Sequence, residues 1–236
     1  MFFENFYEDM GVFDDNIIKD FKEKLLTVDR NNPDLSRPEY CFADGGKLIL
    51  ALHYGQVRNE EFFKFVKPLI DTAYSTGHQC LNDTVPFRIE ISIIEPGKSV
   101  LWHHDQHQFH KFSERIHFPI LTSDKVDFVS KWFKGDTAYK FKMQPGRIYR
   151  FNNRSLHCVN NNNTQDFRCH VMIDFINKGV FEYFRKSGKI ENLSSNVAVT
   201  AADEIYYYIN SKPVGVTATG LTDDDIKQLK TLKNGY

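Results

Sequence analysis

The sequence predicts a mainly β domain with helices on both flanks. From Val85 onward, several short segments alternate apolar and polar residues, which is the pattern of strands with two unlike faces. Turn residues separate these segments, and closely spaced short strands are typical of a closed or sandwiched all-β core. At 236 residues the chain suits one domain, which we divide into a helical N-terminal support (1–82), a β core (83–178) and a C-terminal helical extension or lid (179–236).

Two helices are predicted within the N-terminal support. Between residues 14 and 26, apolar side chains recur every three or four positions, and acidic residues at the start favour a helix N-terminus. A second helix is expected from about residue 60 to 74, where large apolar residues gather on one side. We expect both helices to brace the outside of the β core.

The core is predicted to begin with a strand in which apolar residues at 87, 89, 91 and 93 alternate with polar ones. The segment 95–97, which contains Pro and Gly, predicts a turn after this strand. Pro119 lies within a strand-like run and therefore indicates an edge or a bulge. Further strands are expected at 99–102, 126–133, 137–143 and 148–151, and the asparagines at 160–163 predict a hairpin loop.

The C-terminal part is predicted to be helical at 201–211 and 222–232. Residues 181–184 either continue the core or begin a helix. The polar segment 187–199 is either a lid over the site or a simple connection.

Composition excludes several classes of protein. The net charge of -1 argues against a general nucleic-acid binder, which needs a strong basic excess. The four cysteines are far apart and contain no C-x-x-C pair, so neither a zinc ribbon nor a disulfide framework is predicted. We see no leader peptide and no run of the ~20 apolar residues that a membrane span needs. We therefore expect a soluble, cytoplasmic protein with reduced thiols and no membrane partner.

The richest chemistry lies in the segment 102–107, which contains three histidines and an aspartate. In an extended chain His103 and Asp105 point to the same face and form a chelating pair. A pair of this kind suits a divalent iron that keeps open coordination positions, and His157, at the start of a short apolar run, is the best candidate for a third ligand. The alternative is that the histidines at 103–110 form a solvated loop or an adventitious metal site.

Three basic residues downstream indicate an acidic ligand. Arg168 lies in a strand-like stretch, and arginine holds a carboxylate through two parallel hydrogen bonds. Arg115 and His117 are two residues apart, so in a strand they share one face while the apolar side chains at 116, 118 and 120 share the other.

The order of these motifs resembles the aspartyl/asparaginyl β-hydroxylase-like branch of the iron(II) and 2-oxoglutarate-dependent oxygenases. The likeness covers roughly residues 85–176 and is carried by the segments 102–105, 115–120, 157–160 and 168–174. It implies a double-stranded β-helix, also called a jelly-roll or cupin-like core, in which distant strands bring their ligands to one mouth. It also implies that iron is held by His103, Asp105 and His157, that Arg168 takes the distal carboxylate of 2-oxoglutarate, and that Arg115 and His117 line the cosubstrate site.

The resemblance implies hydroxylation of a C–H bond with dioxygen, coupled to decarboxylation of 2-oxoglutarate to succinate. No general acid or base is expected beyond the iron ligands. His104, His107 and His110 are expected to be bystanders, with His107 the best candidate for a group that supports a ligand. Some animal members lack the carboxylate ligand, so Asp105 makes the chain more similar to bacterial, phage and small-molecule-hydroxylating relatives. The substrate stays open between a protein Asp or Asn side chain and a free amino acid or small metabolite.

Two alternatives belong to other classes. A cupin-like enzyme binds a metal without any 2-oxoglutarate, and a non-enzymatic β-sandwich module picks up metal incidentally through a His-rich loop. Arg115 and Arg168 argue against the cupin-like enzyme, because two buried arginines need an acidic ligand.

Overall fold

The computed structural model describes residues 5–27, 43–53, 56–57, 60–103, 105, 110, 112–132 and 136–186. Its strands are β1 (Tyr7–Val12), β2 (Ala43–His53), β3 (Gln56–Val57), β4 (Thr84–His103), β5 (Ser113–Leu121), β6 (Val126–Lys131), β7 (Tyr139–Phe141), β8 (Arg147–Phe151), β9 (Leu156–Asn161) and β10 (Arg168–Asn177). Its helices are α1 (Asp15–Thr27), α2 (Glu60–Ser75), the short 3-10 helix η2 (Gln79–Leu81) and α3 (Lys178–Lys186).

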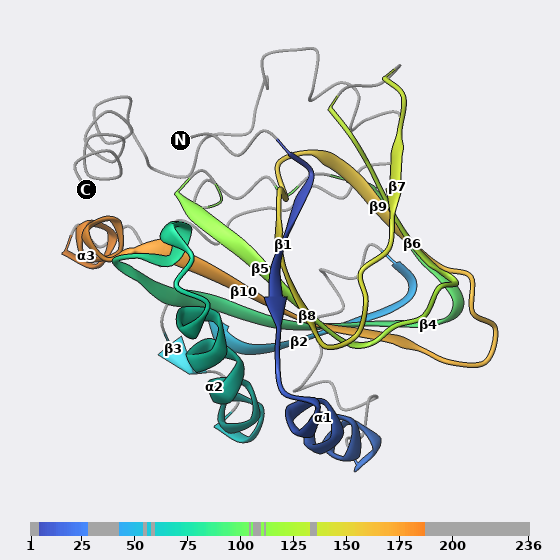
Figure 1. The fold of residues 1–236 in the computed structure, drawn as a ribbon, viewed down its shortest axis with the longest axis horizontal. Coiled ribbons are helices and arrows are strands. Elements are labelled where there is room, and N and C mark those ends of the chain that lie inside the picture. The colour runs from blue at the N-terminus through green and yellow to red at the C-terminus, as the bar shows by residue number, and fades with distance from the viewer. Residues whose placement is uncertain are drawn as a thin grey trace.

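The strands form one ten-stranded antiparallel sheet in the order β1-β8-β5-β10-β4-β9-β6-β7, with β2 beside β4 and β3 beside β2. The sheet curls, so that β6, β7 and β9 rise away from the plane of β4, β5 and β10 (Figure 1). Strand β4 causes this change of direction because it has different neighbours along its length. Residues 84–94 pair with β10, whereas residues 99–103 pair with β9.

The turn predicted at 95–97 is wrong, because these residues form a bend inside one continuous strand. Gly97 has a φ of 71°, and its amide donates to the Asn163 carbonyl at 2.8 Å. The pairing of β2 with β4 shifts register at the same place, between Asp44 and Gly46. Pro and Gly relax the strand locally here, while the pairing on either side keeps it extended.

One face of the sheet is apolar and is covered by α1 and α2 (Figure 1). Helix α2 contributes Phe62, Val66 and Leu69 to this core. The strands contribute a row of buried side chains in strict alternation: Ile89, Ile91, Ile93, Ile116, Phe118, Ile120, Val171 and Ile173. Both predicted helices and the predicted apolar face of residues 116–120 are therefore confirmed.

The opposite face of β4, β5 and β10 is polar, and it is also buried. Its side chains point into the curl of the sheet, and β6 to β9 supply a second apolar cluster that contains Phe128, Tyr149 and Phe151. The buried polar residues on this face are Arg88, Glu90, Ser92, Arg115, His117, Arg168, His170 and Asp174. The alternation that the sequence shows therefore separates two interiors, one apolar and one polar.

The expectation that residues 1–82 are a helical support needs correction, because β1, β2 and β3 lie within this region. Strand β1 is polar and contains Gly11, so its sequence carries little strand pattern, and it forms by pairing with β8. Strand β2 is an apolar run whose pattern suits a buried helix as well as a strand, and it forms by pairing with β4. The remaining division of the chain stays a prediction.

The hairpin predicted at 160–163 is also wrong. Strand β4 lies between β9 and β10, so the connection crosses over β4 instead of joining two neighbours. The side chain of Asn161 donates to three backbone carbonyls in this crossover, those of Ile94, Glu95 and Asp166. A bulge near Pro119 is present, since the pairing of β5 with β10 shifts register between Cys169 and His170.

The chain leaves the core through α3. This helix includes residues 181–184, for which the sequence left both a core strand and a helix open. Asn177 caps this helix, because its side-chain oxygen accepts from the Gly179 amide at 2.8 Å. The predicted lid at 187–199 and the two predicted C-terminal helices lie outside the described residues. In the part of the chain that the structure describes, each helix is too short or too polar to cross a membrane.

Candidate active site

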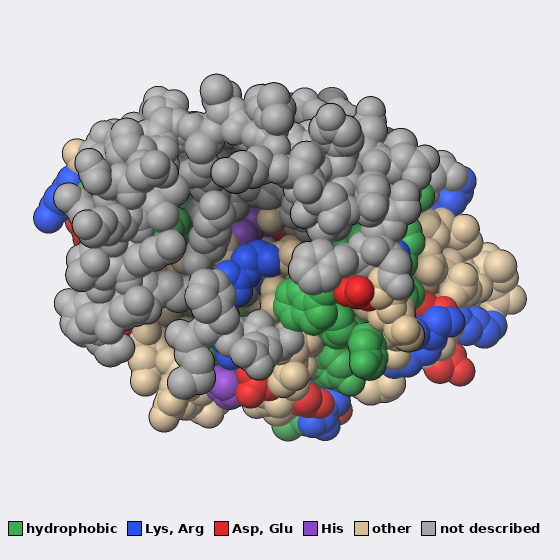
Figure 2. Space-filling view, turned by 90° about the horizontal axis from the view of Figure 1, so that it is seen from above, with side chains coloured by type: hydrophobic (Ala, Val, Ile, Leu, Met, Phe, Trp, Pro, Cys, Tyr) green, Lys and Arg blue, Asp and Glu red, His purple; other side chains and the backbone are tan. Residues whose placement is uncertain are grey.

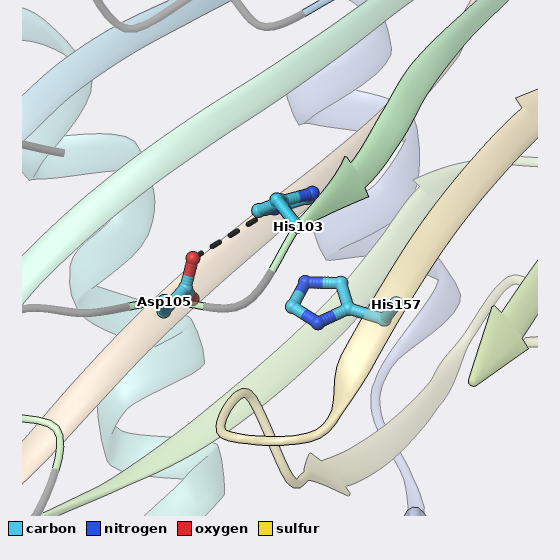
Figure 3. A group of neighbouring side chains, drawn as sticks. All are labelled: His103, Asp105 and His157. Atoms are coloured by element: carbon cyan, nitrogen blue, oxygen red, sulfur yellow. Dashed lines mark ion pairs between the residues drawn. The ribbon is translucent and has the colours of Figure 1, made fainter. Parts of the chain in front are cut away.

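The three residues predicted to bind a metal come together at the mouth of the curled sheet. His103 ends β4 and His157 lies near the start of β9, where the two residues are direct partners in the sheet register. Their rings lie 4.2 Å apart between centroids, and one ligand atom from each of His103, Asp105 and His157 lies within 4.8 Å of the others. The three side chains face a common space (Figure 3).

Backbone carbonyls orient both histidines. The Nδ1 of His103 lies 2.8 Å from the carbonyl oxygen of Leu101, and the Nδ1 of His157 lies 2.8 Å from that of Ser155. A carbonyl only accepts, so each Nδ1 carries the proton and each Nε2 presents its lone pair. Burial lowers the pKa of His157 to about 3, so this ring stays in its neutral, ligating form.

A turn built on Asn152 positions His157. The Asn152 carbonyl accepts from the Ser155 hydroxyl at 2.7 Å, and the Asn152 side chain accepts from the Arg154 amide at 3.3 Å. The next residue, Asn153, accepts from the Asp105 amide at 3.0 Å. The loop before β9 therefore fixes two of the three candidate ligands.

Asp105 is held from behind by Arg115. The guanidinium donates through Nη1 to Asp105, and its other side clamps Asp174, with Nε–Oδ1 and Nη2–Oδ2 distances of 2.8 Å each. Burial raises the pKa of Asp105, but the charge of Arg115, together with the nearby histidines, outweighs burial and holds that pKa well below its usual range. Asp105 is therefore an ionised carboxylate.

The network extends to Glu90, which lies 3.6 Å from Arg115 and pairs with Arg88. The sequence prediction missed Glu90, Arg88 and Asp174. Their charges within apolar strands were a usable signal, since a buried charge needs a partner.

Arg168 lies deeper in the curl and is only 2% exposed. Its Nη1 donates to the Ser92 hydroxyl at 2.9 Å, and its guanidinium carbon lies 5.0 Å from the centre of the Phe128 ring. No described carboxylate pairs with it, and its Nε has no hydrogen-bond partner among the described residues. Burial lowers the pKa of Arg168 to about 9. A buried cation of this kind requires an anion that the described protein does not supply.

His117 lies beside Arg168 and is buried. Its Nδ1 is 3.5 Å from Nδ1 of His170, a residue that the sequence prediction missed. Within the described residues, Nε2 of His117 and Nε2 of His170 have no partner. Sequence spacing alone offers a signal for His170, because it is two residues from Arg168 and shares its face.

Figure 2 views the molecule from above relative to Figure 1. On the described part of this face, basic and histidine side chains lie near a patch of apolar side chains. This face therefore offers both charged and apolar groups.

Comparison with known proteins agrees with this geometry. Residues 70–178 match the model of the family described as Aspartyl/Asparaginyl beta-hydroxylase, and this range contains every site residue named above. This part of the chain is similar to the aspartyl/asparaginyl β-hydroxylase family. The resemblance predicted from the sequence is confirmed. The match agrees with the hydroxylase class expected from the sequence, and His103, Asp105 and His157 form a possible metal site.

Solved structures share the fold of this protein. An oxidoreductase of the 2OG-Fe(II) oxygenase family from Burkholderia pseudomallei is 12% identical over 70% of this chain and 80% of its own, with a TM-score of 0.50. A prolyl-4-hydroxylase from Pseudomonas putida is 10% identical over 75% of this chain and 95% of its own, with a TM-score of 0.51. AviO1 from Streptomyces viridochromogenes is 15% identical over 73% and 90%, with a TM-score of 0.52. The predicted double-stranded β-helix with flanking helices is confirmed. No curated protein matches the sequence.

Proposed function

We propose that this protein is a dioxygen-dependent hydroxylase that binds iron(II) through His103, Asp105 and His157 and anchors the distal carboxylate of 2-oxoglutarate on Arg168. It uses them to hydroxylate an unactivated C–H bond of an aspartyl or asparaginyl side chain, a free amino acid or a small metabolite. The observation that carries this proposal is Arg168, a buried guanidinium that no carboxylate of the described residues pairs with and that lies in the same curled sheet as the group His103, Asp105 and His157.

The donor set fits iron(II). Two neutral imidazoles and one carboxylate form a facial triad, which leaves positions open for a bidentate cosubstrate and for dioxygen. When bound, iron supplies the oxidative chemistry, and the protein supplies position and electrostatics. Arg115 keeps Asp105 ionised and oriented, while the backbone carbonyls keep both imidazoles in the ligating tautomer.

The polar interior fits a dicarboxylate. Arg168 and the Ser92 hydroxyl lie 2.9 Å apart and form a pair that a carboxylate can bridge. Arg115 is already paired with Asp105 and Asp174, which supports a role behind the proposed metal ligands. His117 lies between these two regions, with its Nε2 unpaired among the described groups. We assign Arg115 and His117 to the wall of the cosubstrate site.

Both alternatives account for fewer of these observations. A cupin-like enzyme without cosubstrate does not explain why the positive charge of Arg168 is buried. A β-sandwich module with an incidental metal loop does not require that His157 be buried or that Asp105 be tied to a buried arginine.

The test is a spectroscopic titration without oxygen. Adding iron(II) and 2-oxoglutarate to the wild-type protein is expected to produce a visible charge-transfer band. The His157→Ala variant is expected to lose this band. His104→Ala is expected to keep it, and so is His78→Ala, since His78 pairs with Glu8 on β1. A folded wild-type protein that gives no band contradicts the proposal. If the band forms, a screen for substrate-stimulated succinate formation is expected to identify the substrate.

A further inference from the structure

We propose that His170 is an additional anchor for the distal carboxylate of the cosubstrate and that it sets the preference of the site for a diacid over a monoacid. This inference rests on the proposed function. It concerns a residue outside the metal ligands and outside the arginines discussed above.

The position of His170 follows from strand geometry. It is two residues beyond Arg168 on β10, so both side chains point to the same face. In the register with β4 it lies directly opposite Ser92, whose hydroxyl accepts from Arg168. Directly opposed residues have Cβ atoms about 5 Å apart. His170 therefore borders the same Arg168–Ser92 pair that is assigned to the carboxylate.

Packing fixes the ring of His170. It stacks on Phe128 with a centroid distance of 5.3 Å and an interplanar angle of 24°, and the Arg168 guanidinium lies against that same phenylalanine. The side chain is 0% exposed. Phe128 thus holds a cation and an imidazole side by side without offering either a hydrogen bond.

Three buried nitrogens in this cluster lack a partner among the described residues. They are Nε of Arg168, Nε2 of His117 and Nε2 of His170. Buried polar atoms are normally paired, and leaving one unpaired is unfavourable. Three such atoms in one cluster of side chains indicate a site that binds a polar ligand.

The contact between the two histidines determines which nitrogens donate. Burial lowers the pKa of both His117 and His170 well below the usual value, and the charge of Arg168 lowers both further, so both rings are neutral. Their Nδ1 atoms face each other at 3.5 Å, so one Nδ1 carries a proton and the other accepts it. If His170 is the acceptor, its proton lies on Nε2, which becomes a donor for a carboxylate. This arrangement adds a neutral donor to the cation of Arg168.

The experiment compares two ligands that differ only at the far end. Both 2-oxoglutarate and 2-oxopentanoate carry the same 2-oxo acid group, but only 2-oxoglutarate has a second carboxylate. Each is titrated without oxygen into the iron(II)-loaded protein, and the charge-transfer band gives the Kd. His170→Phe keeps a ring against Phe128 and removes both nitrogens. His170→Gln restores a donor near the position of Nε2.

We expect His170→Phe to weaken 2-oxoglutarate binding by about 10- to 100-fold, as for a lost hydrogen bond to a charged group. Binding of 2-oxopentanoate should change by less than about threefold, because this ligand lacks the carboxylate. His170→Gln should recover most of the loss. Met172→Leu, on the same strand and face, should bind both ligands as the wild type does. If His170→Phe does not fold, His170→Asn replaces it, since its amide is too short to reach the position of Nε2.

The outcomes separate this inference from the proposed function. If the wild-type protein gives no band with 2-oxoglutarate, the proposed function fails. If the wild type binds and His170→Phe binds equally well, only the role of His170 is overturned. An equal loss for both ligands also overturns it, since this result shows that His170 supports the site structurally and does not touch the distal carboxylate.

Discussion

At the scale of single residues, the charges buried in the polar interior distinguish the site from ordinary core. The Arg168 guanidinium contacts a serine hydroxyl and an aromatic ring, whereas the Arg115 guanidinium contacts three carboxylates. These two arginines therefore respond differently to substitution.

Replacing Arg168 by Met should stabilise the ligand-free protein. The change removes a buried charge that no described carboxylate compensates and keeps a side chain of similar length, so we expect the free energy of unfolding to rise by about 1–3 kcal/mol. The same variant should lose the stabilisation that 2-oxoglutarate gives the wild type, which is about 2.7 kcal/mol at one hundred times the Kd. Urea unfolding with and without ligand measures both effects. A ligand-free variant that is less stable than wild type would show that the charge is compensated.

Replacing Asp174 by Asn should weaken metal binding although Asp174 is no ligand. Asp174 holds Arg115, which holds Asp105, and loss of such a supporting group lowers metal affinity by about 10- to 100-fold. Because the change breaks a buried ion pair, stability should fall by about 3 kcal/mol. Asp71→Asn is the matched control, since Asp71 pairs with Lys67 on an exposed helix surface and should cost at most ~0.5 kcal/mol. Unchanged affinity for iron(II) in the Asp174 variant would refute the supporting role.

At the scale of elements, β4 organises the site. Before its bend it carries Ser92 beside Arg168, and after the bend it ends on His103 beside β9. Gly97 lies at the bend with a φ of 71°, a conformation that glycine adopts without strain. The bend therefore lies between the proposed cosubstrate pocket and the proposed metal ligands.

Gly97→Ala should lower the free energy of unfolding by about 1 kcal/mol, because of the left-handed backbone. Steric contact does not contribute, since an added Cβ meets no atom within 4 Å. Gly97→Asn should cost less, because asparagine tolerates this conformation. Chemical unfolding of the three proteins tests this order, and the charge-transfer band should persist in both variants. Equal stability of all three would show that residue 97 is not held at positive φ.

At the scale of the whole molecule, the curled sheet encloses its polar face. His117, His157 and His170 are all buried, and burial lowers the pKa of each. In the unfolded chain each regains an ordinary pKa near 6.5. Below that pH these histidines therefore bind protons in the unfolded state but stay neutral in the folded state.

The metal-free protein should accordingly lose stability as the pH falls from about 6.5 toward the folded pKa values. Each buried histidine contributes up to about 1.4 kcal/mol per pH unit, so three give roughly 4 kcal/mol per unit at the steepest point. Urea unfolding at intervals between pH 8 and pH 5 measures the slope. His170→Phe should reduce the slope by about a third. A free energy of unfolding that does not change over this range would contradict the burial of neutral histidines.

The sequence alone determined the features that depend on local spacing. The chelating pair at 103 and 105, the two N-terminal helices and the apolar row of β5 follow from periods of two or about three and a half residues, which a single segment contains. The order of motifs also indicated the resemblance to the family and, through it, the expected role of Arg168.

Only the tertiary structure decided which alternating face is solvated. The polar row of β4 suits a solvated surface equally well in sequence, but the curl of the sheet buries it. The curl also brings Arg115 to its partners and buries the nitrogens near His170 that no described residue pairs with. The tertiary structure also decided that β1 and β2 are strands and that β4 continues as a strand through residues 95–97, where the sequence predicts a turn. The physical reason is that burial and pairing free energies depend on neighbours far along the chain, which local spacing does not record.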